Sequence, residues 1–159
     1  MKGFTLVEIM LSVALLAVFI PAFIYVFSFS TFAVSQGENY SQAYSIGQEQ
    51  MEAILTLKNT GGSVWDWTTT PSNTAAGEYY QPSQTAGVWS LGAKTTTPAA
   101  SGEFTKLVEI KEVKRCGNTI CSDAWGVVDQ HSREIVVTVK WKENGQDTSV
   151  DLITIVNNI

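Results

Sequence analysis

The sequence predicts an α+β fold in which one long N-terminal helix, apolar in its first half, packs its second half against an antiparallel β-sheet. Three observations carry this prediction. Residues 9–34 contain no charged side chain, residues 40–55 repeat apolar side chains at spacings of three and four, and residues 134–152 alternate apolar and polar side chains around an Asn-Gly turn. The length of 159 residues leaves room for one domain beside a membrane helix.

The uncharged segment is long enough to cross a bilayer. At about 1.5 Å of rise per residue, a helix over residues 9–34 exceeds the roughly 30 Å hydrocarbon core. It is also too long for the apolar core of an ordinary secretory signal peptide. Lys2 places a positive charge on the short side, which favours a cytoplasmic N-terminus and a C-terminal part outside. We therefore expect a single-pass protein of the cytoplasmic membrane.

The charge balance disfavours nucleic acid as a partner. The chain has 10 Lys and Arg against 15 Asp and Glu, which gives a formal net charge of −5. Binding to a phosphate backbone depends on clustered cations that release counterions, and the sequence shows no basic patch.

The residues before the apolar run form a specific motif. A carboxylate at Glu8 beside a membrane helix costs free energy, so Glu8 is either an interfacial residue without a role or a functional group. The string Gly3-Phe4-Thr5-Leu6-Val7-Glu8 with the apolar run behind it resembles the N-terminal signature of type IV pilins and type II secretion pseudopilins. The resemblance is specific over residues 2–34, looser to residue 58, and absent from residues 59–159.

The resemblance implies how the N-terminus is processed. In this family a membrane prepilin peptidase cuts after the glycine, here Gly3, and methylates the new amino terminus, here on Phe4. The glutamate, here Glu8, then neutralises the terminal amine of a neighbouring subunit and so guides recruitment and register. A three-residue leader is shorter than is usual in the family, which leaves open a start further upstream.

The same resemblance divides the chain into four parts and implies a pilin-like fold. The parts are a leader (1–3), a transmembrane and assembly helix (4–34), an amphipathic continuation of that helix (35–58) and an extracytoplasmic β-rich domain (59–159). Pro21 lies a little earlier than the helix-kinking proline of many major pilins. Because proline lacks the N–H of the helical ladder, we expect a kink or local melting near Val18.

The helix should continue into the domain with one apolar face and end at Asn59 and Gly61-Gly62. The stripe of Tyr40, Tyr44 and Met51 on that face could serve a cofactor, but packing against a sheet is the prediction, and we expect no cofactor. Residues 59–103 read as an irregular region with short strands around 64–67, 78–81 and 87–91. Its aromatic side chains either cover the core or form a recognition or subunit contact site. They are Trp65, Trp67, Tyr79, Tyr80 and Trp89.

The C-terminal part predicts a sheet of about four strands. A hairpin is expected over residues 133–156, because a type I′ turn at Asn144-Gly145 brings the apolar faces of both strands together. The register that follows pairs Trp141 with Thr148, Val139 with Val150 and Val137 with Leu152. Further strands are expected over residues 104–114 and 125–128.

Cys116 and Cys121 should form a small disulfide, since an oxidising location permits one and the spacer between them is turn-forming. This pair does not match the larger disulfide loop of many pilins. Two cysteines and the lone His131 lack the ligand number of a structural zinc site, so no metal is expected. His131 should lie in a polar turn at residues 129–132 without a nucleophile or orienting group, and we expect no catalytic residue and no enzyme.

The resemblance implies a structural filament subunit, and residues 43–57 look like the matching helix of minor pilins or minor pseudopilins. Its expected partners are prepilin peptidase, other subunits, an inner-membrane assembly platform and, before assembly, membrane lipids. The filament would be extracellular or periplasmic. The alternative is a surface adhesin or DNA-uptake tip subunit of a competence-type pilus, which solvent-facing aromatic clusters would favour. An anchored enzyme is a third option and would need a convergent cluster of perturbed groups in a pocket.

Overall fold

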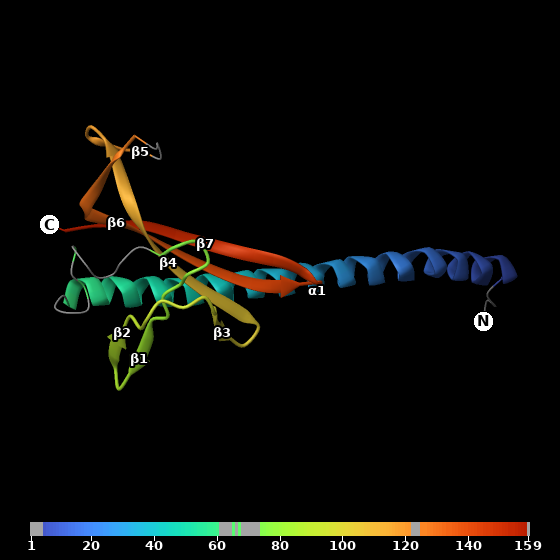
Figure 1. Cartoon of the computed structure of the whole chain (residues 1–159). Coiled ribbons are helices and arrows are strands. Elements are labelled where there is room, and N and C mark those ends of the chain that lie inside the picture. The colour runs from blue at the N-terminus through green and yellow to red at the C-terminus, as the bar shows by residue number, and fades with distance from the viewer. Residues whose placement is uncertain (1–4, 61–64, 66, 68–73, 122–124, 159) are drawn as a thin grey trace. The chain divides into compact units, whose positions relative to one another are not determined.

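A computed structural model describes residues 5–60, 65, 67, 74–121 and 125–158. The fold is α+β, as predicted, with one long helix and antiparallel strands (Figure 1). By its contacts the chain divides into one unit up to Asn39 and a second from Tyr40 onward. The elements are α1 (Leu6–Thr60), β1 (Ser83–Thr85), β2 (Val88–Ser90), β3 (Ala99–Ser101), β4 (Phe104–Cys116), β5 (Thr119–Cys121), β6 (Val127–Glu143) and β7 (Gln146–Asn157).

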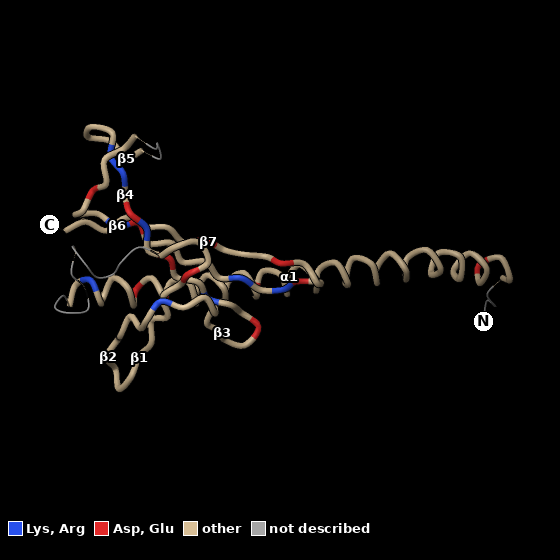
Figure 2. Tube along the Cα trace, in the orientation of Figure 1, with Lys and Arg blue, Asp and Glu red and all other residues tan. Residues whose placement is uncertain are grey.

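The first unit consists of the apolar part of α1. The sequence has no charged residue between Glu8 and Glu38, and the N-terminal part of α1 is accordingly a long tan stretch in Figure 2. Residues 6–38 of this helix are all exposed. The helix is thus long and apolar enough to cross a membrane. It is helical without interruption through Pro21, and the expected kink stays a prediction.

The second unit packs the end of α1 on a sheet. Among the described residues, five strands form one antiparallel sheet in the order β3-β4-β6-β7, with β5 added to the end of β4, and β1 and β2 form a separate hairpin. The sheet thus has one strand more than the four expected. The sequence does not predict β3 and β5 as strands, because each is only three residues long and has no alternating pattern. The helix face toward the sheet buries Ala43, Gly47, Gln50, Ala53, Ile54 and Leu57.

The predicted hairpin of β6 and β7 is confirmed residue by residue. Asn144 and Gly145 have φ values of 51° and 79°, the left-handed pair that a type I′ turn requires. The register pairs Trp141 with Thr148, Val139 with Val150 and Val137 with Leu152. Ile135, Val137 and Val139 on the inner face of β6 have no exposed surface, so this strand lies at the centre of the core.

The expected turn at residues 129–132 is wrong, and so is the separate strand at 125–128. Strand β6 starts at Val127 and runs through both segments to Glu143. Its pairing with β4 jumps from Glu112↔Arg133 to Val113↔Asp129, so the three residues Gln130, His131 and Ser132 are accommodated as a bulge. The polar residues that indicated a turn are extra residues within a strand.

In the described part of the irregular region between α1 and β3, only one of the three expected strands is present as a strand. Trp65 and Trp67 lie in no strand, while residues 64 and 66 are outside the described residues. At residues 78–81 only Tyr79 and Tyr80 make isolated bridges, to Thr95 and Val108. The strand expected at 87–91 is present as β2, and its partner β1 was not anticipated. A Ser- and Thr-rich segment gives little apolar alternation from which short strands could be predicted.

Candidate functional site

The start of α1 holds Glu8 in a capping arrangement. The Glu8 Oε2 atom accepts hydrogen bonds from the Thr5 backbone N–H at 3.2 Å and from the Thr5 hydroxyl at 3.3 Å. The Thr5 carbonyl accepts the Glu8 N–H at 3.0 Å, so Thr5 is the N-cap and Glu8 the third helical residue. This is the Thr-x-x-Glu pattern of a capping box, with the carboxylate at the positive end of the helix dipole.

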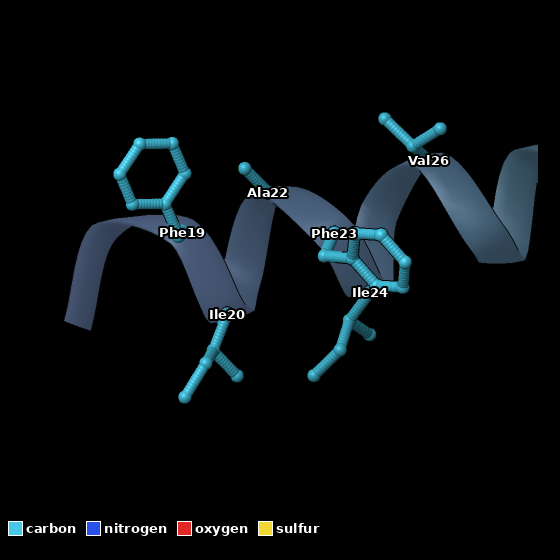
Figure 3. Close-up of a pocket in the computed structure, with 6 residues that line it drawn as sticks. All are labelled: Phe19, Ile20, Ala22, Phe23, Ile24 and Val26. Carbon is cyan, nitrogen blue, oxygen red and sulfur yellow. The ribbon is translucent and has the colours of Figure 1, made fainter. Parts of the chain in front are cut away.

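The apolar helix behind Glu8 exposes its side chains on every side. The exposed fractions of its large apolar residues run from 43% at Phe32 to 76% at Phe23. Around Pro21, apolar side chains line a shallow hollow, with Phe19, Ala22 and Val26 projecting to one side of the helix and Ile20 and Ile24 to the other (Figure 3). A surface this apolar must be covered by lipid or by protein.

The predicted processing residues Gly3 and Phe4 lie outside the described residues, so cleavage and methylation stay predictions. Glu8 and Pro21 are described, and they lie on the same helix. The structure places Glu8 at the helix start, exposed, with Thr5 as its partner.

The aromatic residues of the irregular region pack toward the core. Trp65 is 4% exposed and Tyr80 is 6% exposed. Trp67 and Trp89 are half-buried against the same cluster, and the Trp65 and Trp67 rings meet edge to face at 5.7 Å. Their packing matches the prediction that they cover a small sheet's core, rather than the solvent-facing cluster that a recognition site would present.

One aromatic residue that was not singled out is exposed instead. Trp125 is 93% exposed, ahead of the start of β6. It is accompanied by Ile120 in β5 and Val127 in β6, which are 53% and 76% exposed. The sequence signal for Trp125 is the short apolar run at residues 125–128, which predicts a strand and gives no sign of an exposed side chain.

The two cysteines are joined, as expected. The Cys116–Cys121 disulfide links the end of β4 to β5 across the turn that contains Gly117, with 5.8 Å between the Cα atoms. Figure 1 shows β5 at the far end of β4, away from the β6–β7 turn. We call β5 and the end of β4, residues 114–121, the arm. The bond shapes the tip of this arm and does not tie distant parts of the fold together.

A polar network lies at the base of this arm. The Asp129 carboxylate accepts hydrogen bonds from the Ser132 hydroxyl at 2.7 Å, from the Arg115 Nε–H and from the His131 backbone N–H at 2.9 Å. The Ser132 hydroxyl also lies 2.8 Å from the Asn157 side-chain oxygen. These bonds join β4, the bulge of β6 and the end of β7.

The network sets the protonation of Asp129. The hydrogen bond from Ser132, followed by those from Arg115 and the His131 backbone, lowers the Asp129 pKa from 3.8 to about 2. His131 is exposed within the strand, and its backbone rather than its imidazole contacts the carboxylate. Ser132, at 1% exposed, is closed off from solvent. This arrangement holds the bulge in shape and offers no accessible nucleophile.

Within the described ranges, no group of three His, Cys, Asp or Glu side chains is placed to hold a metal ion. The polar network was missed by sequence reasoning because Arg115 and Asp129 meet only through the β4–β6 pairing. The capping role of Thr5 could have been predicted, since Thr and Glu three residues apart before an apolar run is a known helix-start pattern.

Comparison of the chain with protein-family models, with curated proteins and with solved structures gives no match.

Proposed function

We propose that this chain is a structural subunit of a type IV pilus or type II secretion-like filament, with the features of a minor pilin or minor pseudopilin. Prepilin peptidase would cut after Gly3 and methylate Phe4. The subunit would wait in the cytoplasmic membrane with its β-rich domain outside, and then enter an extracellular or periplasmic filament through its apolar helix.

One observation carries the proposal. The string Gly3 to Glu8 leads directly into an uncharged helix that is exposed all round, and the same helix continues into a compact domain. An apolar helix whose described side chains are exposed on every side needs lipid before assembly and other helices afterwards. A contact between two different faces of such subunits builds an open helical filament where its rotation does not close into a ring.

Glu8 supports the proposal through its position. Its carboxylate stands at the first turn of α1 and is bound only by Thr5 among the contacts of the described residues. After cleavage, the terminal amine of a neighbouring Phe4 would be a cation in an apolar setting. Pairing it with Glu8 would offset the desolvation of both charges and specify the register of the subunits.

The tip-adhesin alternative is less well supported. It would be favoured by clustered aromatic side chains facing solvent, whereas Trp65 and Tyr80 are buried and Trp67 and Trp89 pack against the core. The burial of these four aromatic side chains therefore supports the filament subunit over a tip subunit that recognises a ligand through them.

A Glu8→Leu variant tests the assembly step in native cells. We expect the variant to be cleaved and to remain in the membrane, whereas the wild type appears in the sheared filament fraction. Glu38→Leu, which removes another exposed carboxylate of α1, is the matched control and should assemble. Assembly of Glu8→Leu at the wild-type level would contradict the role given to Glu8.

A further inference from the structure

Among the described residues, no strand pairs with the outer edge of β7. The strand order ends at β7, and the opposite edge, beyond β4, is covered by β3, by β5 and by the bridge of Tyr80 to Val108. In Figure 1 β7 lies along the outer side of β6. Its pairing with β6 covers all twelve residues, Gln146–Asn157, without a register shift.

The register shows which backbone groups point away from β6. The Asn158 N–H donates to the His131 carbonyl at 2.8 Å, which marks this pair as a hydrogen-bonding position of the ladder, although the His131 N–H itself donates to Asp129. Hydrogen-bonded pairs in an antiparallel ladder recur at every second residue. The even-numbered residues of β7 are therefore bonded to β6, and the odd-numbered residues, from Asp147 to Asn157, direct their N–H and C=O groups outward.

The side chains of these same residues are exposed on the outer face of the sheet. All six odd-numbered residues of β7 are exposed, and Ile153 and Ile155 are 62% and 38% exposed. Ile153 is paired with Val136 of β6, which is buried, so the exposed apolar side chains of this face lie at the edge strand. The outward hydrogen-bonding groups and the apolar side chains thus belong to one row of residues.

Natural proteins usually block such edges with proline, lysine, bulges or a covering segment. Strand β7 has no proline, no lysine and no register shift, and Ile153–Val156 carry no charge. Its two charged residues are Asp147 and Asp151, both acidic and both at outward positions. Among the described residues, no backbone hydrogen bond from another segment reaches this edge.

We propose that β7 accepts an extended strand of another polypeptide by β-strand addition. Its backbone would pair with the outward groups of residues 149–157, two apolar side chains spaced two residues apart would lie against Ile153 and Ile155, and a Lys or Arg would face Asp151. A second copy fits less well, because β7 paired with itself brings acidic residues and no basic ones to the interface, in a chain of net charge −5. The inference goes beyond the proposed function and does not depend on processing at Gly3.

Photo-crosslinking in the full chain, in its native membranes, tests the contact. Benzoylphenylalanine is placed at position 153 or 155, with position 88 in β2, where Val88 is 70% exposed, as the matched control. We expect adducts from 153 and 155 that map, by mass spectrometry, to residues two apart in one segment of another polypeptide, and no such adduct from 88. Adducts confined to lipid or to a second copy, or scattered over unrelated segments, would overturn the proposal.

Two variants test the pairing itself, with benzoylphenylalanine at 155. Ile153→Pro removes an outward N–H and leaves the bonds to β6, so the adduct should fall about tenfold, as expected for the loss of about one hydrogen bond. Asp151→Lys should reduce the adduct, because the new lysine would repel the Lys or Arg of the added strand. Asp151→Glu keeps the negative charge and should keep the adduct. The intact β6–β7 hairpin is checked by resistance to proteolysis. An adduct that is unchanged in both Ile153→Pro and Asp151→Lys would contradict strand addition.

Discussion

Replacement of Asp129 by Asn should destabilise the second unit in a pH-dependent manner. The Asp129 pKa is about 2 in the folded chain against 3.8 for an ordinary carboxyl, so the carboxylate form favours folding. At about 1.4 kcal/mol per pKa unit, the difference corresponds to about 2 kcal/mol of unfolding free energy. Because the folded pKa is depressed, this contribution is fully present above about pH 4 and is lost as the pH falls through about 2.

The assay is urea unfolding of the full chain in nonionic detergent, followed by tryptophan fluorescence at pH 7, 5, 4, 3 and 2. Asp129→Asn keeps the shape of the side chain but cannot ionise, so the gap between wild type and variant isolates this carboxylate from all others. We expect a gap of about 2 kcal/mol at pH 7 that closes toward pH 2. Asp151→Asn, which changes an exposed carboxylate outside the network, is the control. An equal gap at pH 7 and pH 2 would refute the reasoning.

Three further outcomes are expected from the same unfolding measurements. Gly47→Val should lower the unfolding free energy by about 1 to 3 kcal/mol, because an added Cβ would lie 2.7 Å from Leu152 Cδ1, whereas Gly37→Val, with nothing within 4 Å, should not cause this overpacking loss. Gly145→Ala should cost about 1 to 2 kcal/mol, because φ is +79° there, and an unchanged midpoint would contradict the turn. Replacing Cys116 and Cys121 by Ser together should cost only about 2 kcal/mol, because the bridged residues are 5 apart, and a loss of all cooperative unfolding would show that the arm holds the fold.

Short sequence patterns predict those parts of the fold whose geometry depends on residues close together in the chain. The Asn144-Gly145 turn defines the register of β6 and β7, and the alternating side chains give the same register independently. α1 is described up to Thr60, and Gly61 and Gly62 lie outside the described residues, so the expected glycine end of this helix stays a prediction. In the hairpin, the residues that carry the signal are close in sequence to the feature they predict.

Features that depend on distant pairing could not be predicted in this way. The bulge at residues 130–132 exists because β4 continues past Glu112 and keeps pairing with β6 beyond it. Local composition at these residues indicates a turn, and only the partner strand converts them into a bulge. The Arg115 and Asp129 contact depends on the same pairing. Thr5 is the opposite case, since the Thr-x-x-Glu spacing alone predicts its capping role, without any distant partner.

The most direct test of the proposed function is the mass of the N-terminus of the protein taken from its native membranes, compared with a Gly3→Ala variant. We predict a mature wild-type chain that begins at Phe4 and carries one methyl group on its amine, and a variant that is left uncut. A wild-type chain that keeps Met1 as its first residue, like the variant, would contradict the assignment to a processed filament subunit.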